Sequence, residues 1–155
     1  MPNTLDVYNK LSKLPFGNQL FTRALTFKTP YFSAIHPLIT DVRPGYCRVE
    51  MADRRSIRNH LSTIHAGALC NLCELTGGLA VEVSVPSDIR WIPKEMTVRY
   101  LKKATGKLTG ICSFDPKILV PGDVTVPLEI QNANNEAVLS ARILFYLSRR
   151  QKKLE

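Results

Sequence analysis

Three polar side chains stand close together in the segment from residue 58 to residue 74: Asn59, His65 and Glu74. A histidine or a carboxylate can take up or release a proton, and an amide can orient a water molecule or a carbonyl group. Such groups within a stretch that is otherwise rich in apolar and small residues indicate a site rather than plain core. The set suits attack on a polarised carbonyl carbon, as in acyl transfer.

A helix must present these groups, because the apolar, small-residue stretch from Ile64 to Val83 is too long for one strand. Glu74 falls in the middle of that predicted helix. Its neighbours three and four positions away are all small or polar: Cys70, Asn71, Gly77 and Gly78. Two interpretations stay open, a carboxylate that faces a cavity or another chain and acts as a base, and an ordinary solvent-facing glutamate.

His65 lies where the predicted helix begins, and the amides of Ala66 and Gly67 follow it. The first amides of a helix have no partner within the helix and point their N–H groups outward. They could therefore hold the oxygen of a polarised carbonyl group. The alternatives are that His65 is a structural residue and that Asn59 is an ordinary loop residue.

The spacing of His65 and Glu74 predicts a site shared between two chains. They are nine residues apart, which separates them by about 13.5 Å along one helix axis. One carbonyl group cannot contact both. A two-fold dimer with antiparallel central helices would bring Glu74 of one chain beside His65 and the Ala66 amide of the other. We therefore expect a homodimer or a dimer of dimers.

The segments around the central helix are typical of strands. Ile35 to Val42 and Tyr46 to Met51 predict a hairpin before the helix. Four further strands are predicted after the helix, at residues 95–101, 107–114, 123–131 and 137–147. An antiparallel sheet wrapped around one helix is an α+β arrangement, and this layout is the hotdog fold.

The two ends of the chain are predicted to be additions to this core. Thr4 is the predicted cap of a first amphipathic helix, and a second helical stretch runs from about Asn18 until Pro30. We expect both helices to be packing extensions without a chemical role. The chain is interpreted as a single domain over residues 1–155, with a helical extension over 1–30, the core over 35–147 and a basic tail over 148–155.

The composition favours an anionic partner. Among 155 residues, 21 Lys and Arg against 13 Asp and Glu give a formal net charge of +8. Four of the basic residues flank the candidate site and could hold phosphate groups, although each is otherwise a plain solvated side chain: Arg58, Lys102, Lys103 and Lys107. Few aromatic residues are interleaved with these charges, so nucleic acid is disfavoured. No membrane segment or signal peptide is recognisable, and we expect a cytoplasmic protein.

The four cysteines are Cys47, Cys70, Cys73 and Cys112. Cys70 and Cys73 form a C-x-x-C motif, which occurs in redox pairs and in halves of zinc sites. No second pair or histidine cluster stands at ligand spacing elsewhere. We therefore expect reduced thiols that serve as small core side chains, and no metal site.

The polar residues also match a known family. An Asn at 59, a His six positions later, then a small residue and a Gly, and an acid nine positions after the His resemble the signature of hotdog-fold acyl-CoA thioesterases of the phenylacetyl-CoA thioesterase-like branch. The motif R-N-H-x-x-x-I-H-A from Arg58 and the later Tyr100-Leu-Lys-Lys-Ala104 are similar to a bacterial hotdog group known as a domain of unknown function. The resemblance covers roughly residues 35–147.

The resemblance implies hydrolysis of an acyl-CoA thioester without a metal or an organic cofactor. It implies that the Ala66 amide is the oxyanion donor, that Glu74 is the base or nucleophile, that Asn59 assists and that His65 orients the loop. The family usually has Gly at position 66 and often Asp at position 74, and Pro93 stands near an auxiliary serine of some members. The alternative is a non-catalytic hotdog protein that binds acyl-CoA or a fatty acyl chain. No motif of a hotdog dehydratase or hydratase is recognisable.

Overall fold

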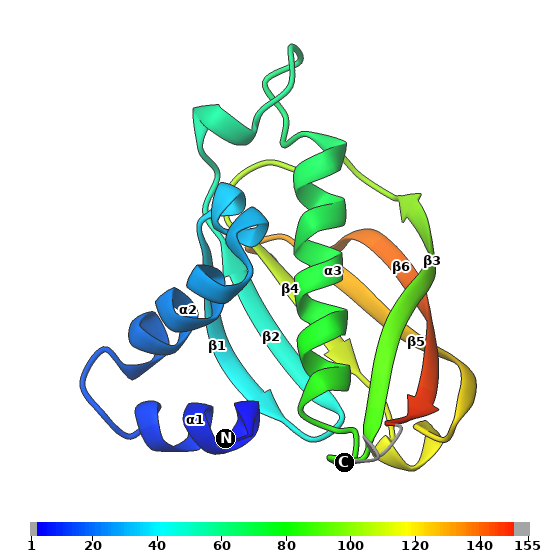
Figure 1. Cartoon of the computed structure of the whole chain (residues 1–155). Coiled ribbons are helices and arrows are strands. Elements are labelled where there is room, and N and C mark those ends of the chain that lie inside the picture. The colour runs from blue at the N-terminus through cyan, green and yellow to red at the C-terminus, as the bar shows by residue number, and fades with distance from the viewer. Residues whose placement is uncertain (1–2, 151–155) are drawn as a thin grey trace.

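One long helix, α3 (Ala66–Glu82), lies against the concave face of a curved sheet in the computed structural model, which describes residues 3–150 (Figure 1). The helix contacts all six strands of that sheet. It packs closely because Gly77 faces the sheet: a Cβ at this position would lie only 2.8 Å from the Cδ1 atom of Ile143. The predicted central helix is therefore present, with its ends shifted inward by one or two residues.

The sheet is antiparallel throughout, and its strands follow the spatial order β1-β2-β4-β5-β6-β3. The strands are β1 (Pro37–Arg43), β2 (Tyr46–Met51), β3 (Ile89–Tyr100), β4 (Leu108–Ser113), β5 (Gly122–Gln131) and β6 (Ala137–Arg149). Short 3-10 helices interrupt the connections at η1 (Pro30–Ile35), η2 (Arg55–Ile57) and η3 (Pro116–Ile118). A six-stranded antiparallel sheet wrapped around one helix confirms the predicted α+β hotdog fold.

Strand β3 begins at Ile89, six residues before the start expected from the sequence. Pro93 lies in the part that was not expected to be strand, and proline has no N–H to donate within a sheet. The strand lies at the edge of the sheet, where proline is tolerated, and a bulge between Pro93 and Glu95 absorbs the irregularity. Its partner β6 extends to Arg149, which pairs with Ile89, so the first residues of the expected tail belong to the sheet. Residues 151–155 of that tail lie outside the described residues.

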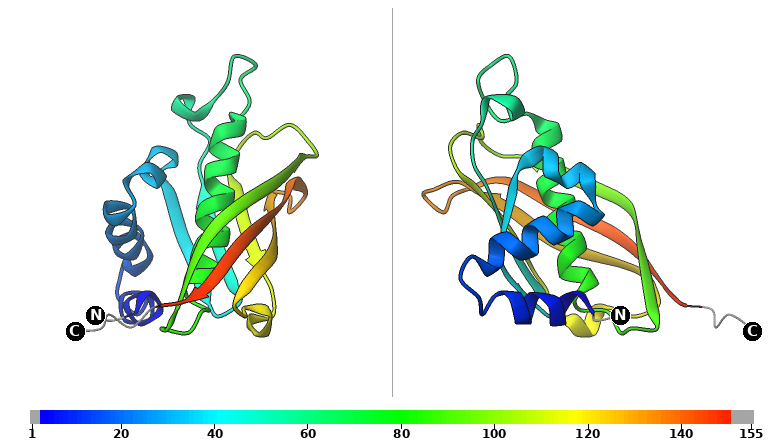
Figure 2. Two further views of the ribbon diagram at one scale, coloured as in Figure 1. Left: turned by 45° about the vertical axis from the view of Figure 1, so that its right-hand side comes forward. Right: turned by 60° about the vertical axis from the view of Figure 1, so that its left-hand side comes forward.

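The N-terminal residues form two helices, α1 (Thr4–Leu11) and α2 (Gly17–Lys28). The expectation that Thr4 caps the first helix was wrong: the Asn3 side chain accepts from the N–H groups of Leu5 and Asp6 instead, because a short amide side chain at this position reaches the free N–H groups of the first turn. The Thr4 hydroxyl donates to Glu82 Oε1 at 3.3 Å. Helix α2 packs on β1, and η1 contacts α3 (Figure 2).

All four cysteines are free thiols. Cys47, Cys73 and Cys112 are buried in the core, whereas Cys70 is half-buried on α3. Burial raises the pKa of the Cys47 and Cys73 thiols and raises that of Cys112 to about 12. These three thiols therefore stay protonated and pack as small apolar side chains.

Within residues 3–150, no helix has the length and apolar character needed to cross a membrane.

Candidate active site

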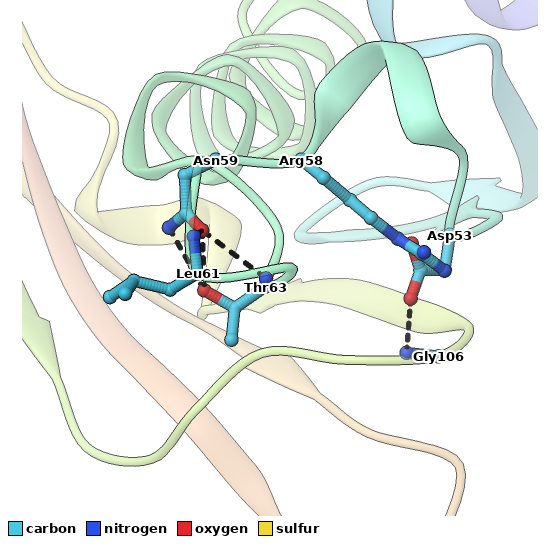
Figure 3. A network of polar contacts seen from close by, with 6 residues as sticks. All are labelled: Asp53, Arg58, Asn59, Leu61, Thr63 and Gly106. Atoms are coloured by element: carbon cyan, nitrogen blue, oxygen red, sulfur yellow. Dashed lines mark hydrogen bonds and ion pairs between the residues drawn. The ribbon is translucent and has the colours of Figure 1, made fainter.

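Asn59 holds together the loop that leads into α3 (Figure 3). Its Oδ1 atom accepts hydrogen bonds from the N–H groups of Leu61 at 2.9 Å and Thr63 at 3.2 Å. Its Nδ2 group donates to Thr63 Oγ1 at 2.9 Å, and its backbone N–H donates to Thr63 O at 2.8 Å. The Asn59 side chain is thus engaged within its own turn, as asparagine side chains often are.

Asp53 fixes the same loop to the connection between β3 and β4 (Figure 3). Its Oδ1 atom accepts from Arg58 Nε at 2.7 Å, and its Oδ2 atom accepts from the Gly106 N–H at 2.8 Å. The hydrogen bond from Arg58 holds the pKa of Asp53 below its ordinary value. The Ile64 N–H donates to Ala104 O at 2.8 Å beside them. The two loops therefore form one end of the molecule.

His65 is the N-cap residue of α3. Its Nδ1 atom accepts from the Gly67 N–H at 2.9 Å, and its own N–H donates to Ile57 O at 2.7 Å. The Gly67 amide, expected to be free for a ligand, is therefore occupied. Ala66 is exposed, and its N–H has no hydrogen-bond partner among the described residues. Of the two candidate oxyanion donors, the Ala66 amide is the available one.

Glu74 lies at the ninth position of α3 with an exposed side chain. Its carboxylate makes no hydrogen bond or ion pair to any described residue. It borders a hollow of about 230 Å³ that it shares with five residues of β3 and β6: Pro93, Lys94, Glu95, Met96 and Ile143. It also borders a second, larger groove on the side of the N-terminal helices. Glu74 thus faces open space beside the helix, which agrees both with the cavity interpretation and with that of a solvent-facing glutamate.

One chain does not bring His65 and Glu74 together. They occupy the cap and the ninth position of the same helix, about 13.5 Å apart along its axis. Asn59, His65 and Ala66 gather at one end of the molecule, and Glu74 lies two and a half turns away. One chain therefore does not place the Ala66 amide and the Glu74 carboxylate within reach of one carbonyl group.

Sequence reasoning missed two polar pairs near α3. Cys70 Sγ lies 3.6 Å from the Tyr100 hydroxyl, and this contact raises the pKa of Tyr100. Trp91 Nε1 donates to Glu82 Oε2 at 2.7 Å. The signal that could have located Trp91 is the Gly77–Gly78 pair, because two glycines inside a helix indicate close approach of a neighbour.

Three of the four basic residues predicted to bind phosphate are already paired with acids. Arg58 pairs with Asp53, Lys102 Nζ lies 2.9 Å from Glu136 Oε1, and Lys107 Nζ lies 2.6 Å from Glu50 Oε2. Lys103 is exposed and has no partner among the described residues. Exposed ion pairs of this kind are weak and can exchange partners. Lys103 is therefore the most available cation of the set.

Comparison with solved structures identifies close relatives in fold. The crystal structure of genomics APC5556 is 33% identical over 95% of this chain and 99% of that one, with a TM-score of 0.84. Protein PA5026 from Pseudomonas aeruginosa, described as a protein of unknown function and a probable thioesterase, is 25% identical over 88% and 97%, with a TM-score of 0.76. The Escherichia coli PaaI protein from the phenylacetic acid degradation operon is 17% identical over 84% and 91%, with a TM-score of 0.71, and shares the fold.

The chain also matches a protein-family model. The model described as "Domain of unknown function (DUF4442)" matches residues 17–147. This match spans α2, the hairpin, α3 and nearly all of the sheet. Among curated proteins, none matches this chain.

Proposed function

The chain belongs to the DUF4442 family, and we propose that this member hydrolyses acyl-CoA thioesters to a free acid and CoA. The observation that carries the proposal is that the Glu74 carboxylate is exposed and lies beside two hollows, without a hydrogen-bond or ion-pair partner among the described residues. The first amide of the same helix, that of Ala66, also has no hydrogen-bond partner there. The P. aeruginosa relative described as a probable thioesterase supports it. Four free thiols fit a reducing compartment, and we place the reaction in the cytoplasm.

In the proposed reaction the thioester carbonyl oxygen accepts a hydrogen bond from the Ala66 N–H. The positive end of the α3 dipole stabilises the negative charge that develops on this oxygen. Glu74 takes a proton from the attacking water or attacks the carbonyl carbon itself. The C–S bond then breaks, and CoA leaves as its thiol with the proton that Glu74 took from water. If Glu74 attacks the carbon itself, a water molecule then cleaves the anhydride that forms, which releases the acid, restores Glu74 and supplies the proton for the CoA thiolate. His65 keeps the helix start in place, and Asn59 keeps the preceding turn in place.

Two chains supply each site in this proposal. The outer edge of β3 is unpaired within the described residues, and this strand is 12 residues long. An exposed strand edge of this length is a template for pairing with another strand. Pairing about a two-fold axis would bring α3 of one copy beside α3 of the other. Glu74 of one chain would then serve the Ala66 amide of its partner, in a homodimer or a dimer of dimers.

The phosphates of CoA are assigned to the basic end of the molecule. Lys103 is unpaired, and Arg58, Lys102 and Lys107 lie on the same two loops. Their positive charge would attract the phosphates over several ångströms. This end also carries the Ala66 amide, so the thioester and the phosphates would be held at neighbouring positions.

A panel of acyl-CoA substrates tests the proposal. Each acyl-CoA is mixed with the purified protein and a thiol-detecting reagent, and release of free CoA is followed with time. We expect turnover that is saturable in substrate. Binding of acyl-CoA without release of CoA from any member of the panel would contradict hydrolysis and favour the alternative, a non-catalytic hotdog protein that binds acyl-CoA.

A further inference from the structure

A mostly apolar groove of about 390 Å³ runs along the outer face of α3. In Figure 1 this helix lies between the N-terminal helices on one side and β3 on the other. Leu25 and Phe32 line the groove from α2 and η1, and Trp91 lines it from β3. Three residues of α3 complete the lining between them: Leu75, Gly78 and Leu79. The N-terminal helices, expected to be packing extensions, thus supply one wall of a binding groove.

The groove begins at the candidate catalytic carboxylate. Both Glu74 and Glu82 line it, eight residues apart on α3, which corresponds to about 12 Å along the helix axis. An extended alkyl chain advances by about 1.3 Å per carbon when its C–C bonds are about 1.5 Å long. The stretch between the two carboxylates therefore has the length of about nine carbon atoms.

The Glu82 carboxylate marks the far end of this stretch, and the Trp91 indole ring that holds it lines the second half, from Gly78 to Glu82. The ring nitrogen of Trp91 donates to Glu82 Oε2 at 2.7 Å, and the Thr4 hydroxyl donates to Glu82 Oε1 at 3.3 Å. The Trp91 ring also packs edge-on against Phe145, with centroids 5.3 Å apart. Two contacts, from α1 and β3, thus fix the Glu82 carboxylate, and Phe145 of β6 supports the indole ring.

Gly78 keeps the middle of the groove open. A Cβ atom at this position would lie 3.3 Å from Cη2 of Trp91. This spacing is already tight for a methyl group, so any larger side chain at residue 78 would fill the space beside the indole ring. Gly78 is four residues from Glu74, or about 6 Å along the axis. A side chain here would block the groove about half-way.

We propose that this groove binds the acyl chain of the substrate and that the Glu82 carboxylate, held in place by Trp91, limits the chain to about nine carbons. The substrate class is then a linear acyl-CoA of medium length. The inference rests on the proposed function, because the acyl carbonyl must lie near Glu74 where the groove begins. The apolar lining from three sides suits an alkyl chain. The carboxylates at both ends would repel the carboxylate of a free fatty acid in either direction.

Binding of non-hydrolysable S-alkyl-CoA thioethers tests the groove apart from turnover. Isothermal titration with the butyl to tetradecyl series should show Kd falling about fourfold for each added methylene while the chain remains in the groove. Kd should stop falling at a chain length of about nine carbons. A Kd that does not depend on chain length would overturn the proposal, including the case in which a second copy covers the groove in solution.

Two lining variants and one control complete the test. In Gly78→Leu, Kd should stop falling at a chain length of about four or five carbons. In Trp91→Ala, which releases Glu82, Kd should continue to fall beyond nine carbons. Phe27→Ala is the matched control, because Phe27 belongs to α2 but is 89% exposed and does not line the groove. Its profile should equal that of the wild type.

The outcomes separate the two proposals. Shifted binding profiles without CoA release from true thioesters would leave the groove in place and contradict the hydrolase. CoA release with the same chain-length profile in wild type, Gly78→Leu and Trp91→Ala would contradict the groove and leave the hydrolase in place. If Gly78→Leu fails to fold, Trp91→Ala alone decides the assignment.

Discussion

The Nδ1 atom of His65 accepts a hydrogen bond from the N–H of Gly67 at 2.9 Å, so the side chain of His65 caps the helix that starts at the next residue. This contact occupies one of the two free amides at the helix start and leaves that of Ala66 available. In the proposed reaction, His65 acts on the site through the helix terminus, and Glu74 is the side chain that contacts the reacting atoms.

Replacing His65 separates capping from other roles. His65→Ala should cost about 1 kcal/mol of stability through the lost cap, which lowers Tm by a few degrees, and should reduce kcat because the Gly67 N–H is released. His65→Asn keeps an acceptor at the N-cap and should restore Tm and most of kcat. Thermal unfolding and steady-state kinetics measure both. A His65→Ala protein with wild-type Tm and kcat would contradict the capping role.

Asp53 should make the loop end of the molecule sensitive to acid. Its pKa is lowered in the folded protein by the hydrogen bond from Arg58, so its contribution to stability is present above its unfolded pKa of about 3.9 and is lost as the pH falls through the lower, folded value. Asp53→Asn should therefore be less stable than wild type at pH 7, and this difference should shrink below about pH 4. Urea unfolding across pH measures it. An unchanged difference from pH 7 to pH 3 would refute the assignment.

The central helix, the sequence of strands along the chain and the place of Glu74 within the helix could be predicted, because each follows from local periodicity and turn residues. The start of β3 could not, since Pro93 is compatible with a strand only at a sheet edge, and edges are decided by the whole topology. The hydrogen bond that occupies the Gly67 amide could not be predicted either, because it depends on the rotamer of the His65 side chain. The pairing of Lys102 with Glu136 joins residues 34 positions apart, which no local pattern records.

The basic residues should differ in their effect on CoA binding. Lys103→Glu should raise KM for acyl-CoA more than Lys102→Glu, because Lys102 is already partly neutralised by Glu136. The KM of the wild type should rise with salt, and this dependence should weaken in Lys103→Glu. Steady-state kinetics between low and high salt measure both effects. Equal and salt-independent KM values in all three proteins would show that this surface does not hold CoA.

Mixed dimers test the sharing of sites between chains. A chain carrying Asn59→Ala and a chain carrying Glu74→Ala should each be inactive as homodimers. In a mixed dimer, one site combines the intact loop of one chain with the intact Glu74 of the other. Random pairing makes about half of the dimers mixed, each with one working site, so roughly a quarter of wild-type activity should return. Inactivity of verified mixed dimers would contradict a shared site.

The most direct test of the whole account is CoA release by Glu74→Gln, measured beside Asp88→Asn, which removes an exposed carboxylate away from the site. Glutamine keeps the size of the side chain but cannot accept a proton from water or attack a carbonyl carbon. Glu74→Gln should fold normally, bind an S-alkyl-CoA thioether with an affinity near that of wild type, and lose thioester hydrolysis by at least about a hundredfold. Asp88→Asn should turn over at the wild-type rate. Near wild-type CoA release by Glu74→Gln would remove this residue from the mechanism and contradict the account.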